Sequence, residues 1–335
     1  MSANLIGIDA TAIERWFTTT VPDAEPPLSF DLLAGGRSNL TYRVTDRRER
    51  SWVLRRPPAG PVPPGAHSME REWRILTVLQ QTAVPVPPTI AFCADPEVTG
   101  AEFYVMDHID GIVIDSSKAA AVLNHSARHR LGCEVVATLV DLHRVDPALL
   151  SRNREVPTRS HVNRQLDFWI QQLSGDGRQI PEIVAAHAAL AKNAPPQRWV
   201  AVTHGDFRLG NVLVAPTGRI KAVLDWELWT VGDPLADLGW LTAWWTLTED
   251  DGWAPKRAAD FPTVDELAAG YQRLTGRDIS NLAYYTSFAL WRLACIAEGV
   301  YQRYAAGMMG TSATPLDVLA ARPRELASAA LSALR

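Results

Sequence analysis

Residues 200–240 constrain this chain more than any other stretch, because short apolar runs alternate there with a histidine, several aspartates and an asparagine. Short apolar runs bounded by glycine or proline are typical of buried strands. Two such runs flank Pro-Thr-Gly at residues 216–218, which predicts a hairpin turn between two strands. The hairpin would bring Asn211, which precedes its first strand, close to Asp225, which follows its second.

Asn211 and Asp225 would then offer a carboxamide oxygen and a carboxylate, hard ligands of the kind that Mg²⁺ takes when it also bridges phosphates. Asp206 lies five residues before Asn211. It could accept a proton from a hydroxyl group that attacks a phosphate held by the metal. The spacing of these three residues is that of the catalytic and metal-binding loops of protein kinases, and His204 stands where kinases carry a histidine.

A simpler explanation exists for each of these residues alone. One aspartate at such a position would cap a loop, so the case for a site rests on the combination at kinase spacing. His204 is expected to be a structural hydrogen-bonding residue rather than a base. Asp233 and Asp237, in GDPLADLGW, are expected to cap and brace the following helix, because aspartate before proline is common at helix starts.

The chain resembles the aminoglycoside phosphotransferase family, the small-molecule branch of the kinase-like fold. The family signature is HGDxxxxN followed by a D-W/F-E segment and GDPxxDL, and this sequence contains HGDFRLGN, DWE and GDPLADL. The segments GGRSNLTYRV, WVLRRPP, REWRIL and LHRVD resemble those of the kinase-like domains fused to acyl-CoA dehydrogenases. The resemblance covers nearly the whole chain. It implies a bilobal, protein-kinase-like α+β fold, with a small antiparallel β-sheet lobe at residues 1–107 and a mainly helical lobe at residues 108–335.

A glycine turn separates two expected strands near the start of the chain. In a kinase-like fold this turn lies over the phosphates, where glycine permits close backbone approach and N–H groups can donate to oxygen. Two glycines are equally compatible with a plain hairpin, but their position before WVLR favours a phosphate loop. The candidate nucleotide-binding residues here are Gly35, Gly36, Ser38 and Asn39.

Residues 52–55, WVLR, match the V-A-I-K strand of kinases. Period-two alternation places Val53 and Arg55 on one face, so that Val53 would touch the adenine and Arg55 the phosphates. Arginine keeps the charge of the usual lysine and can grip phosphate through two parallel hydrogen bonds, but its planar head changes the geometry. Glu72, on a helix expected over residues 68–81, is predicted to pair with Arg55 as in kinases. A solvated first-turn glutamate is the alternative.

The strand expected at residues 103–109 precedes a glycine, and such a strand joins the two lobes in this fold. Its backbone from Met106 to His108 is expected to hold the adenine edge. Arg208, two residues after Asp206, stands where protein kinases carry a lysine near the γ-phosphate.

Beyond residue 126 the pattern predicts mainly helices. The first would be capped by Ser126 and reach His143, whose proximity to Asp141 is better explained by packing than by function. Further helices are expected at residues 235–247, 263–274, 280–305 and 314–334.

Composition narrows the class of protein. Hydrophobic residues at 47%, charged residues at 21% and a formal net charge of −4 are ordinary for a globular protein and provide no basic footprint for nucleic acid. Cysteines 93, 133 and 295 have no metal-site spacing and are expected to be reduced. No leader-like start and no bilayer-length apolar run is apparent, so the cytoplasm is the expected compartment, with no membrane partner.

These observations predict a small-molecule kinase that uses Mg²⁺ and either ATP or GTP. Asp206 and Arg208 would be catalytic, and Asn211 and Asp225 would bind the metal. Residues 241–335 contain ten acidic and nine basic residues, whereas a polycationic aminoglycoside needs an excess of carboxylates. The subgroup resemblance instead points to a hydroxyacyl-type acceptor.

Three alternatives stay open. The chain could be a catalytically weak or inactive nucleotide-binding protein, or it could be an aminoglycoside phosphotransferase after all. A metal hydrolase built on His204-x-Asp206 is disfavoured, because no second histidine pair lies at ligand spacing.

Overall fold

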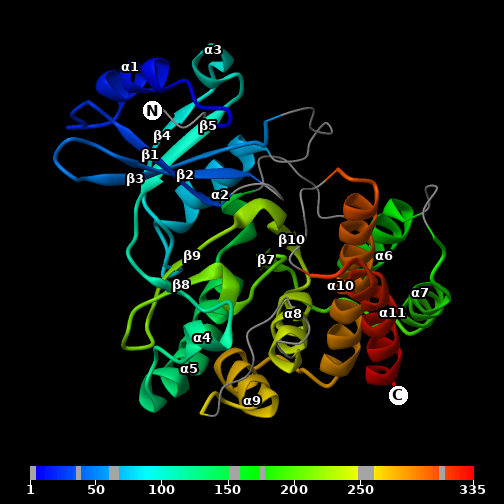
Figure 1. Cartoon of the computed structure of the whole chain (residues 1–335). Helices are drawn as coiled ribbons and strands as arrows, with labels where there is room; N and C mark the ends of the chain where they lie inside the picture. The colour runs from blue at the N-terminus through cyan, green and yellow to red at the C-terminus, as the bar shows by residue number, and fades with distance from the viewer. Residues whose placement is uncertain are drawn as a thin grey trace. The chain divides into compact units, whose positions relative to one another are not determined.

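The computed structural model describes residues 5–34, 39–59, 68–150, 159–173, 178–247, 260–308 and 314–335. The chain divides into two compact units, one formed by Met1–Asp110 with Ala222–Glu227 and the other by Gly111–Lys221 with Leu228–Arg335. The predicted α+β class is confirmed, with an antiparallel sheet in the N-terminal part of the chain and mainly helices in the C-terminal part (Figure 1).

The first unit is built on a five-stranded sheet with the order β1-β2-β3-β5-β4, in which all neighbours pair antiparallel. The strands are β1 (Ser29–Ala34), β2 (Leu40–Thr45), β3 (Ser51–Arg56), β4 (Thr89–Cys93) and β5 (Phe103–Asp107). The strands predicted at residues 52–55 and 103–109 correspond to β3 and β5.

Three helices accompany this sheet, namely α1 (Ala10–Thr20), α2 (Met69–Leu79) and α3 (Pro96–Thr99). Helix α2 starts at residue 69 because the Ser68 hydroxyl accepts a hydrogen bond from the Arg71 N–H at 3.2 Å. Its buried positions include Glu72, Ile75 and Leu76, so that a carboxylate lies on the apolar face of the helix.

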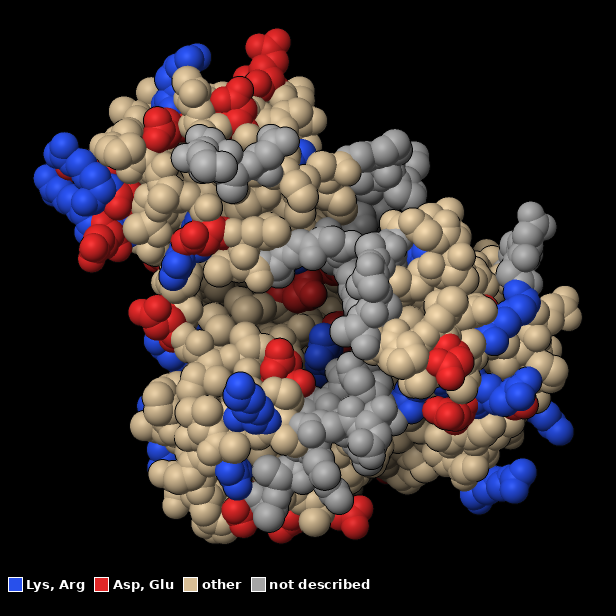
Figure 2. Space-filling view, viewed as in Figure 1, with Lys and Arg blue, Asp and Glu red and all other residues tan. Residues whose placement is uncertain are grey.

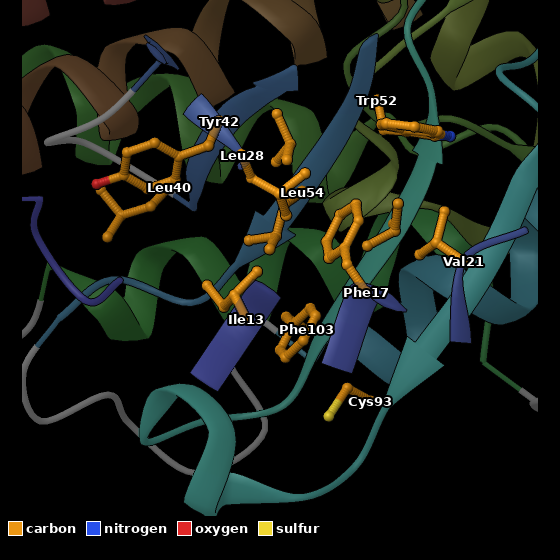
Figure 3. Packing of buried hydrophobic residues seen from close by; sticks show 12 residues of the cluster. Ile13, Phe17, Val21, Leu28, Leu40, Tyr42, Trp52, Leu54, Cys93 and Phe103 are labelled. Carbon is orange, nitrogen blue, oxygen red and sulfur yellow. The ribbon is translucent and has the colours of Figure 1, made fainter. Parts of the chain in front are cut away.

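The core of the first unit lies between α1 and one face of the sheet (Figure 3). Phe17 of α1 meets Trp52 of β3 edge-on at 5.9 Å between ring centroids, and Trp16 meets Phe103 of β5 at 4.8 Å. Because side chains alternate across a strand, Tyr104 then lies on the opposite face. The sheet thus separates an apolar face from the face that carries the charged residues described below.

The second unit contains two small sheets. One has the order β6-β8-β9 and the other pairs β10 with β7 antiparallel. The strands are β6 (Ile112–Val113), β7 (Ala201–Thr203), β8 (Val212–Val214), β9 (Ile220–Val223), whose end passes into the first unit, and β10 (Thr230–Gly232). The hairpin predicted at residues 216–218 is confirmed: the Gly218 N–H donates to the Ala215 oxygen at 2.8 Å, and Gly218 has a φ of 84°.

Helices form the rest of the second unit. They are α4 (Ser117–Ala120), α5 (His125–Arg144), α6 (His161–Gln172), α7 (Pro181–Lys192), α8 (Pro234–Thr246), α9 (Val264–Thr275), α10 (Leu282–Ala305) and α11 (Leu316–Ala333). Short 3-10 turns occur at Pro147–Leu149, Leu209–Asn211 and Trp226–Leu228. None of the described helices combines the length and hydrophobicity needed to span a membrane.

The predicted cap of α5 is wrong by two residues. Asn124, not Ser126, is the N-cap, since its side chain accepts a hydrogen bond from the Ala127 N–H at 2.9 Å. Both residue types can cap a helix, but Asn124 has the extended backbone of a cap, and Ser126 lies inside the first turn.

The surface shown in Figure 2 carries basic side chains interspersed with acidic ones. An exposed ion pair joins Arg43 and Asp31 in the first unit. Exposed pairs of this kind contribute little to stability.

Helices α8 and α10 approach closely where Gly239 faces the backbone of Tyr285. A Cβ atom at residue 239 would lie 2.5 Å from the carbonyl carbon and oxygen of Tyr285. The same contact is reinforced by a hydrogen bond of 2.8 Å between the hydroxyls of Thr242 and Thr286. Glycine therefore sets the distance between the two helices.

We expect Gly239→Ala to lower the free energy of unfolding by about 1–3 kcal/mol, because the added methyl group overpacks the α8–α10 contact. Gly270→Ala on α9 is the matched control. Its Cβ would meet Val136 at an ordinary 3.6 Å, so the better helix propensity of alanine should leave stability equal or higher by up to about 1 kcal/mol. Urea unfolding of both variants measures the difference, and equal effects would show that the close contact carries no constraint.

Candidate active site

The loop that follows β7 is held by one carboxylate. Asp237, near the start of α8, accepts hydrogen bonds from the His204 N–H at 2.6 Å and from the Gly205 N–H at 2.9 Å. Gly205 has a φ of 83°, and a Cβ there would lie 2.5 Å from the Leu228 oxygen. Only glycine fits this turn without strain.

Asp237 is itself buried and supported by His143. Burial acts to raise the pKa of Asp237, but the hydrogen bond and charge of His143 more than offset it, and the pKa lies below its usual range. The other ring nitrogen of His143 lies 2.8 Å from the Tyr271 hydroxyl. His143 is thus a buried packing residue, as expected, but its partner is Asp237 and not Asp141. Residues two apart on a helix do not face each other.

Asp233 caps α8, as the sequence predicts. Its carboxylate accepts a hydrogen bond from the Leu235 N–H at 3.0 Å and another from the Tyr285 hydroxyl at 2.6 Å. Asp237 does more than brace this helix, because it also fixes the backbone of the loop at residues 204 and 205.

Asp206 lies on this loop with donors on both of its oxygens. Its Oδ1 accepts from the Trp240 indole N–H at 2.7 Å, and its Oδ2 accepts from the Asn211 amide at 2.8 Å. The Arg208 Nε lies 3.3 Å from Oδ1, and the side chain of Asp206 is 20% exposed. A carboxylate held in this way is oriented and reachable, which is what a general base requires.

His204 has the structural role that its position predicts. The residue is fully buried, and its Nδ1 accepts a hydrogen bond from the Asp206 N–H at 3.1 Å. Among the described residues, no group of three or more His, Cys, Asp or Glu side chains is placed to hold a metal ion.

The side-chain amide nitrogen of Asn211 donates to Asp206, and its carbonyl oxygen is a second polar atom. Its Nδ2 donates to the backbone oxygen of Asp206 at 2.9 Å as well as to the carboxylate. The amide nitrogen is thereby committed, which leaves the carbonyl oxygen as the atom that would ligate a cation. Arg208, the other catalytic candidate, lies with its guanidinium 4.7 Å from the Trp244 ring centroid.

In the first unit, Glu72 is the centre of a buried polar cluster. Its Oε2 accepts from the Arg55 Nε at 2.8 Å and from the Tyr104 hydroxyl at 3.0 Å, and its Oε1 accepts from the Asn39 amide at 2.6 Å. Glu72 is 1% exposed, so the alternative of a solvated glutamate is wrong. The pairing expected between Glu72 and Arg55 is present.

Arg55 uses its remaining donors within the same unit. Its Nη2 donates to Asp225 Oδ1 at 2.6 Å, and its Nη1 donates to the Thr41 hydroxyl at 3.3 Å. Burial acts to lower the pKa of Arg55, but Glu72 and other neighbours outweigh it and hold this pKa well above the ordinary value. Asp225 has a φ of 64°. This left-handed conformation is strained for a residue other than glycine, and such strain is common at functional sites.

Val53 and Met106, two further candidates, lie on the same sheet, and His108 directly follows β5. Val53 of β3 pairs directly with Met106 of β5, and both side chains are buried. The Nδ1 of His108 lies 3.6 Å from the Asp110 carboxylate. Three further candidates, Gly35, Gly36 and Ser38, lie outside the described residues.

Sequence reasoning did not predict the contacts that Tyr104, Trp240 and Arg292 make at the site. Tyr104 donates to Glu72, and Trp240 donates to Asp206. Arg292, on α10, donates to the Gly205 backbone oxygen and lies 3.9 Å from the Trp240 ring centroid. The one signal in the sequence is Arg292 itself, a charged residue inside an otherwise apolar run of α10.

Comparison with known proteins gives consistent matches. The family model described as the phosphotransferase enzyme family matches residues 29–275. Acyl-CoA dehydrogenase family member 11 from Gallus gallus is 32% identical over 315 residues, which are 89% of this chain and 40% of that protein. The chain therefore spans less than half the length of this curated relative.

Two solved structures show the same fold. A Ralstonia eutropha protein, provisionally classed as an aminoglycoside phosphotransferase, has a TM-score of 0.81 and 27% identity, with 97% of this chain and 98% of that chain covered. The GDP complex of aminoglycoside 2'-phosphotransferase-IIIa has a TM-score of 0.61 and 14% identity, with 97% of each chain covered.

We expect Asp237→Asn to lower the free energy of unfolding by about 1.5–3 kcal/mol, the usual contribution of hydrogen bonds to a charged group. The amide can accept one of the two backbone N–H groups but opposes the other with its own donor. Asp167→Asn is the control, because its partner Arg159 and Asp167 itself are both exposed, and this change should cost less than about 1 kcal/mol. Chemical denaturation compares the two variants, and an equally mild effect at residue 237 would contradict its role in the loop.

Proposed function

The chain belongs to the phosphotransferase enzyme family, as the resemblance of its motifs predicted, and we propose that it transfers the γ-phosphoryl group of ATP or GTP to a hydroxyl group of a small molecule. The observation that carries this proposal is the Asp206 carboxylate, which is held by donors on both oxygens and still partly exposed. Such a group can orient the acceptor hydroxyl and take its proton as the phosphorus is attacked.

The first unit supports the same chemistry through Arg55. In kinases a basic residue on the third strand contacts the phosphates and pairs with a glutamate of the following helix. Here Arg55 is held by Glu72, and Glu72 is held in turn by Tyr104 and Asn39. We assign Arg55 to the phosphates of the donor, Val53 and the backbone at Met106 and His108 to its base, and the glycine turn before Asn39 to the phosphate loop.

Asn211 and Asp225 could both bind Mg²⁺, because each has a side-chain oxygen that its protein partners leave available. Asn211 has its amide nitrogen committed to Asp206 and its carbonyl oxygen to offer. Asp225 shares Oδ1 with Arg55 and keeps Oδ2 for a cation. Hard oxygen ligands of this type suit Mg²⁺, which when bound would neutralise charge on the donor phosphates.

For the acceptor we propose a hydroxyacyl-type alcohol rather than an aminoglycoside. Residues 241–335 carry ten acidic and nine basic side chains, which is a poor complement for a polycation. The relative from Gallus gallus is named for an acyl-CoA dehydrogenase, which favours an acyl-bearing substrate by analogy.

Substitutions of Asp206 and Asp225 should have different effects, because the two residues are assigned different roles. Asp206→Asn is expected to lower turnover by a factor on the order of 10² to 10⁴, the usual contribution of a positioned base, while nucleotide binding stays near wild type. Asp225→Asn should instead weaken Mg²⁺-dependent nucleotide binding. Thermal shift with MgATP and MgGTP, with EDTA as control, measures binding, since wild type should gain about 2.7 kcal/mol at 100 times Kd.

Each contrary outcome has its own meaning. Wild type that is not stabilised by either nucleotide contradicts the kinase assignment. Wild type that binds nucleotide but transfers no phosphoryl group supports the catalytically inactive alternative. Equal turnover in wild type and Asp206→Asn removes Asp206 from the mechanism.

A panel of hydroxyacyl thioesters, free hydroxy acids and kanamycin tests the acceptor. With MgATP or MgGTP as donor, we expect transfer to a hydroxyacyl compound and at most weak activity on kanamycin, because the C-terminal residues lack an acidic excess. Phosphorylated product is detected by mass spectrometry, and reactions without enzyme or with Asp206→Asn are the controls. Kanamycin phosphorylation with kcat/KM of about 10⁴ M⁻¹s⁻¹ or more, the range of evolved enzymes, would overturn the assignment.

A further inference from the structure

Among the described residues, Trp240 makes the shortest hydrogen bond to the carboxylate of Asp206. The distance of 2.7 Å from the indole Nε1 to Oδ1 is at the short end for an N–H···O bond, as hydrogen bonds to ionised acceptors are. Trp240 is 2% exposed and lies on α8, three residues after Asp237. Positions three apart share a helix face, so one face of α8 carries both the backbone support of the loop and a donor to its carboxylate.

Arg292 packs against the face of the Trp240 ring. Its guanidinium lies 3.9 Å from the centroid of the Trp240 ring and donates to the backbone oxygen of Gly205. Arg292 is 6% exposed. Burial lowers its pKa to about 10, although Asp206 and Asp237 act to raise it. A cation over the face of an indole is held by the electron density of the ring, so the guanidinium connects the indole plane to the loop.

Three donors surround the carboxylate of Asp206. Oδ2 accepts from the Asn211 amide at 2.8 Å, and Oδ1 accepts from the Trp240 indole N–H at 2.7 Å. The Arg208 Nε lies 3.3 Å from Oδ1 and 3.4 Å from Oδ2. Without the indole donor, the carboxylate could turn toward the guanidinium and form a closer ion pair.

We propose that Trp240, supported by Arg292, is the positioning residue that fixes the Asp206 carboxylate for the acceptor hydroxyl. This inference rests on the proposed function. In the reaction, the acceptor oxygen forms a bond to the γ-phosphorus, the bond from that phosphorus to the β–γ bridging oxygen breaks, and the nucleoside diphosphate leaves. The hydroxyl proton passes to Asp206. Trp240 touches none of the reacting atoms and acts only through the carboxylate.

Trp240→Phe removes the indole N–H and leaves an aromatic ring under Arg292. With MgATP and the acceptor identified in the panel, we expect kcat to fall by roughly tenfold to a hundredfold, as small misplacements of catalytic groups do, with KM for MgATP unchanged. Trp245→Phe is the matched control on the same helix. Its indole N–H donates to the Pro262 oxygen at 2.8 Å, so it loses a comparable buried hydrogen bond and should keep kcat.

A double-mutant cycle separates positioning from a structural role. If Trp240 acts through Asp206, then Trp240→Phe should cause no further loss of kcat in the Asp206→Asn background, because residues that act as a unit are non-additive. Independent, multiplying losses would overturn the proposal. Arg292→Gln provides a second variant should Trp240→Phe not fold, and its loss of kcat should likewise vanish in the Asp206→Asn background.

A readout that needs no turnover distinguishes failure of the contact from failure of the proposed function. In protein labelled with ¹⁵N, the Trp240 indole signal is assigned by its loss in Trp240→Phe. Asp206→Ala should shift that signal and leave the Trp245 signal in place. An unmoved Trp240 signal overturns the hydrogen bond. Wild-type kcat in Trp240→Phe overturns only the positioning role, whereas wild type without transfer to any acceptor overturns the proposed function on which that role rests.

Discussion

The hydrogen bonds that Asp237 accepts from two consecutive backbone N–H groups are the interaction on which the second unit depends most. Accepting from both His204 and Gly205 fixes two adjacent peptide planes, and this places the side chain of Asp206 that follows. Asp237 can do so only because α8 lies where it does, and its distance from α10 is set by Gly239 against the Tyr285 backbone. The close contact between α8 and α10 therefore determines where the carboxylate stands.

The first unit uses one carboxylate in a similar way. Glu72 accepts from Arg55, Tyr104 and Asn39 while almost fully buried. A buried charge is costly unless it is paired and hydrogen-bonded, and three donors meet that requirement. The consequence is an arginine with a defined direction, and because guanidinium has further donors, Arg55 also reaches Asp225. A lysine, with a single nitrogen, would not offer the same fork.

Sequence alone predicts those features that depend on spacing within one segment, such as the hairpin at residues 216–218, which follows from apolar runs and turn residues. The α+β class and the Arg55–Glu72 pairing were instead expected from the resemblance of several motifs to the kinase-like family. The contacts of Tyr104, Trp240 and Arg292 were not predicted because they join segments 32 to 87 residues apart, and no periodicity encodes such contacts. The cap of α5 was misplaced for a local reason, since Asn124 and Ser126 are both good cap formers.

Two buried charged residues of the second unit, Asp237 and Arg292, bind the backbone of the same loop. Asp237 and Arg292 are each enclosed among apolar helices, where removing a charge from water costs more than an average hydrogen bond returns. A well-packed apolar side chain would serve stability at least as well. Yet both groups reach the same peptide segment, Asp237 through the His204 and Gly205 N–H groups and Arg292 through the Gly205 oxygen. Polar groups that converge on one short loop from two helices specify its orientation, and with it the direction of the Asp206 carboxylate that follows.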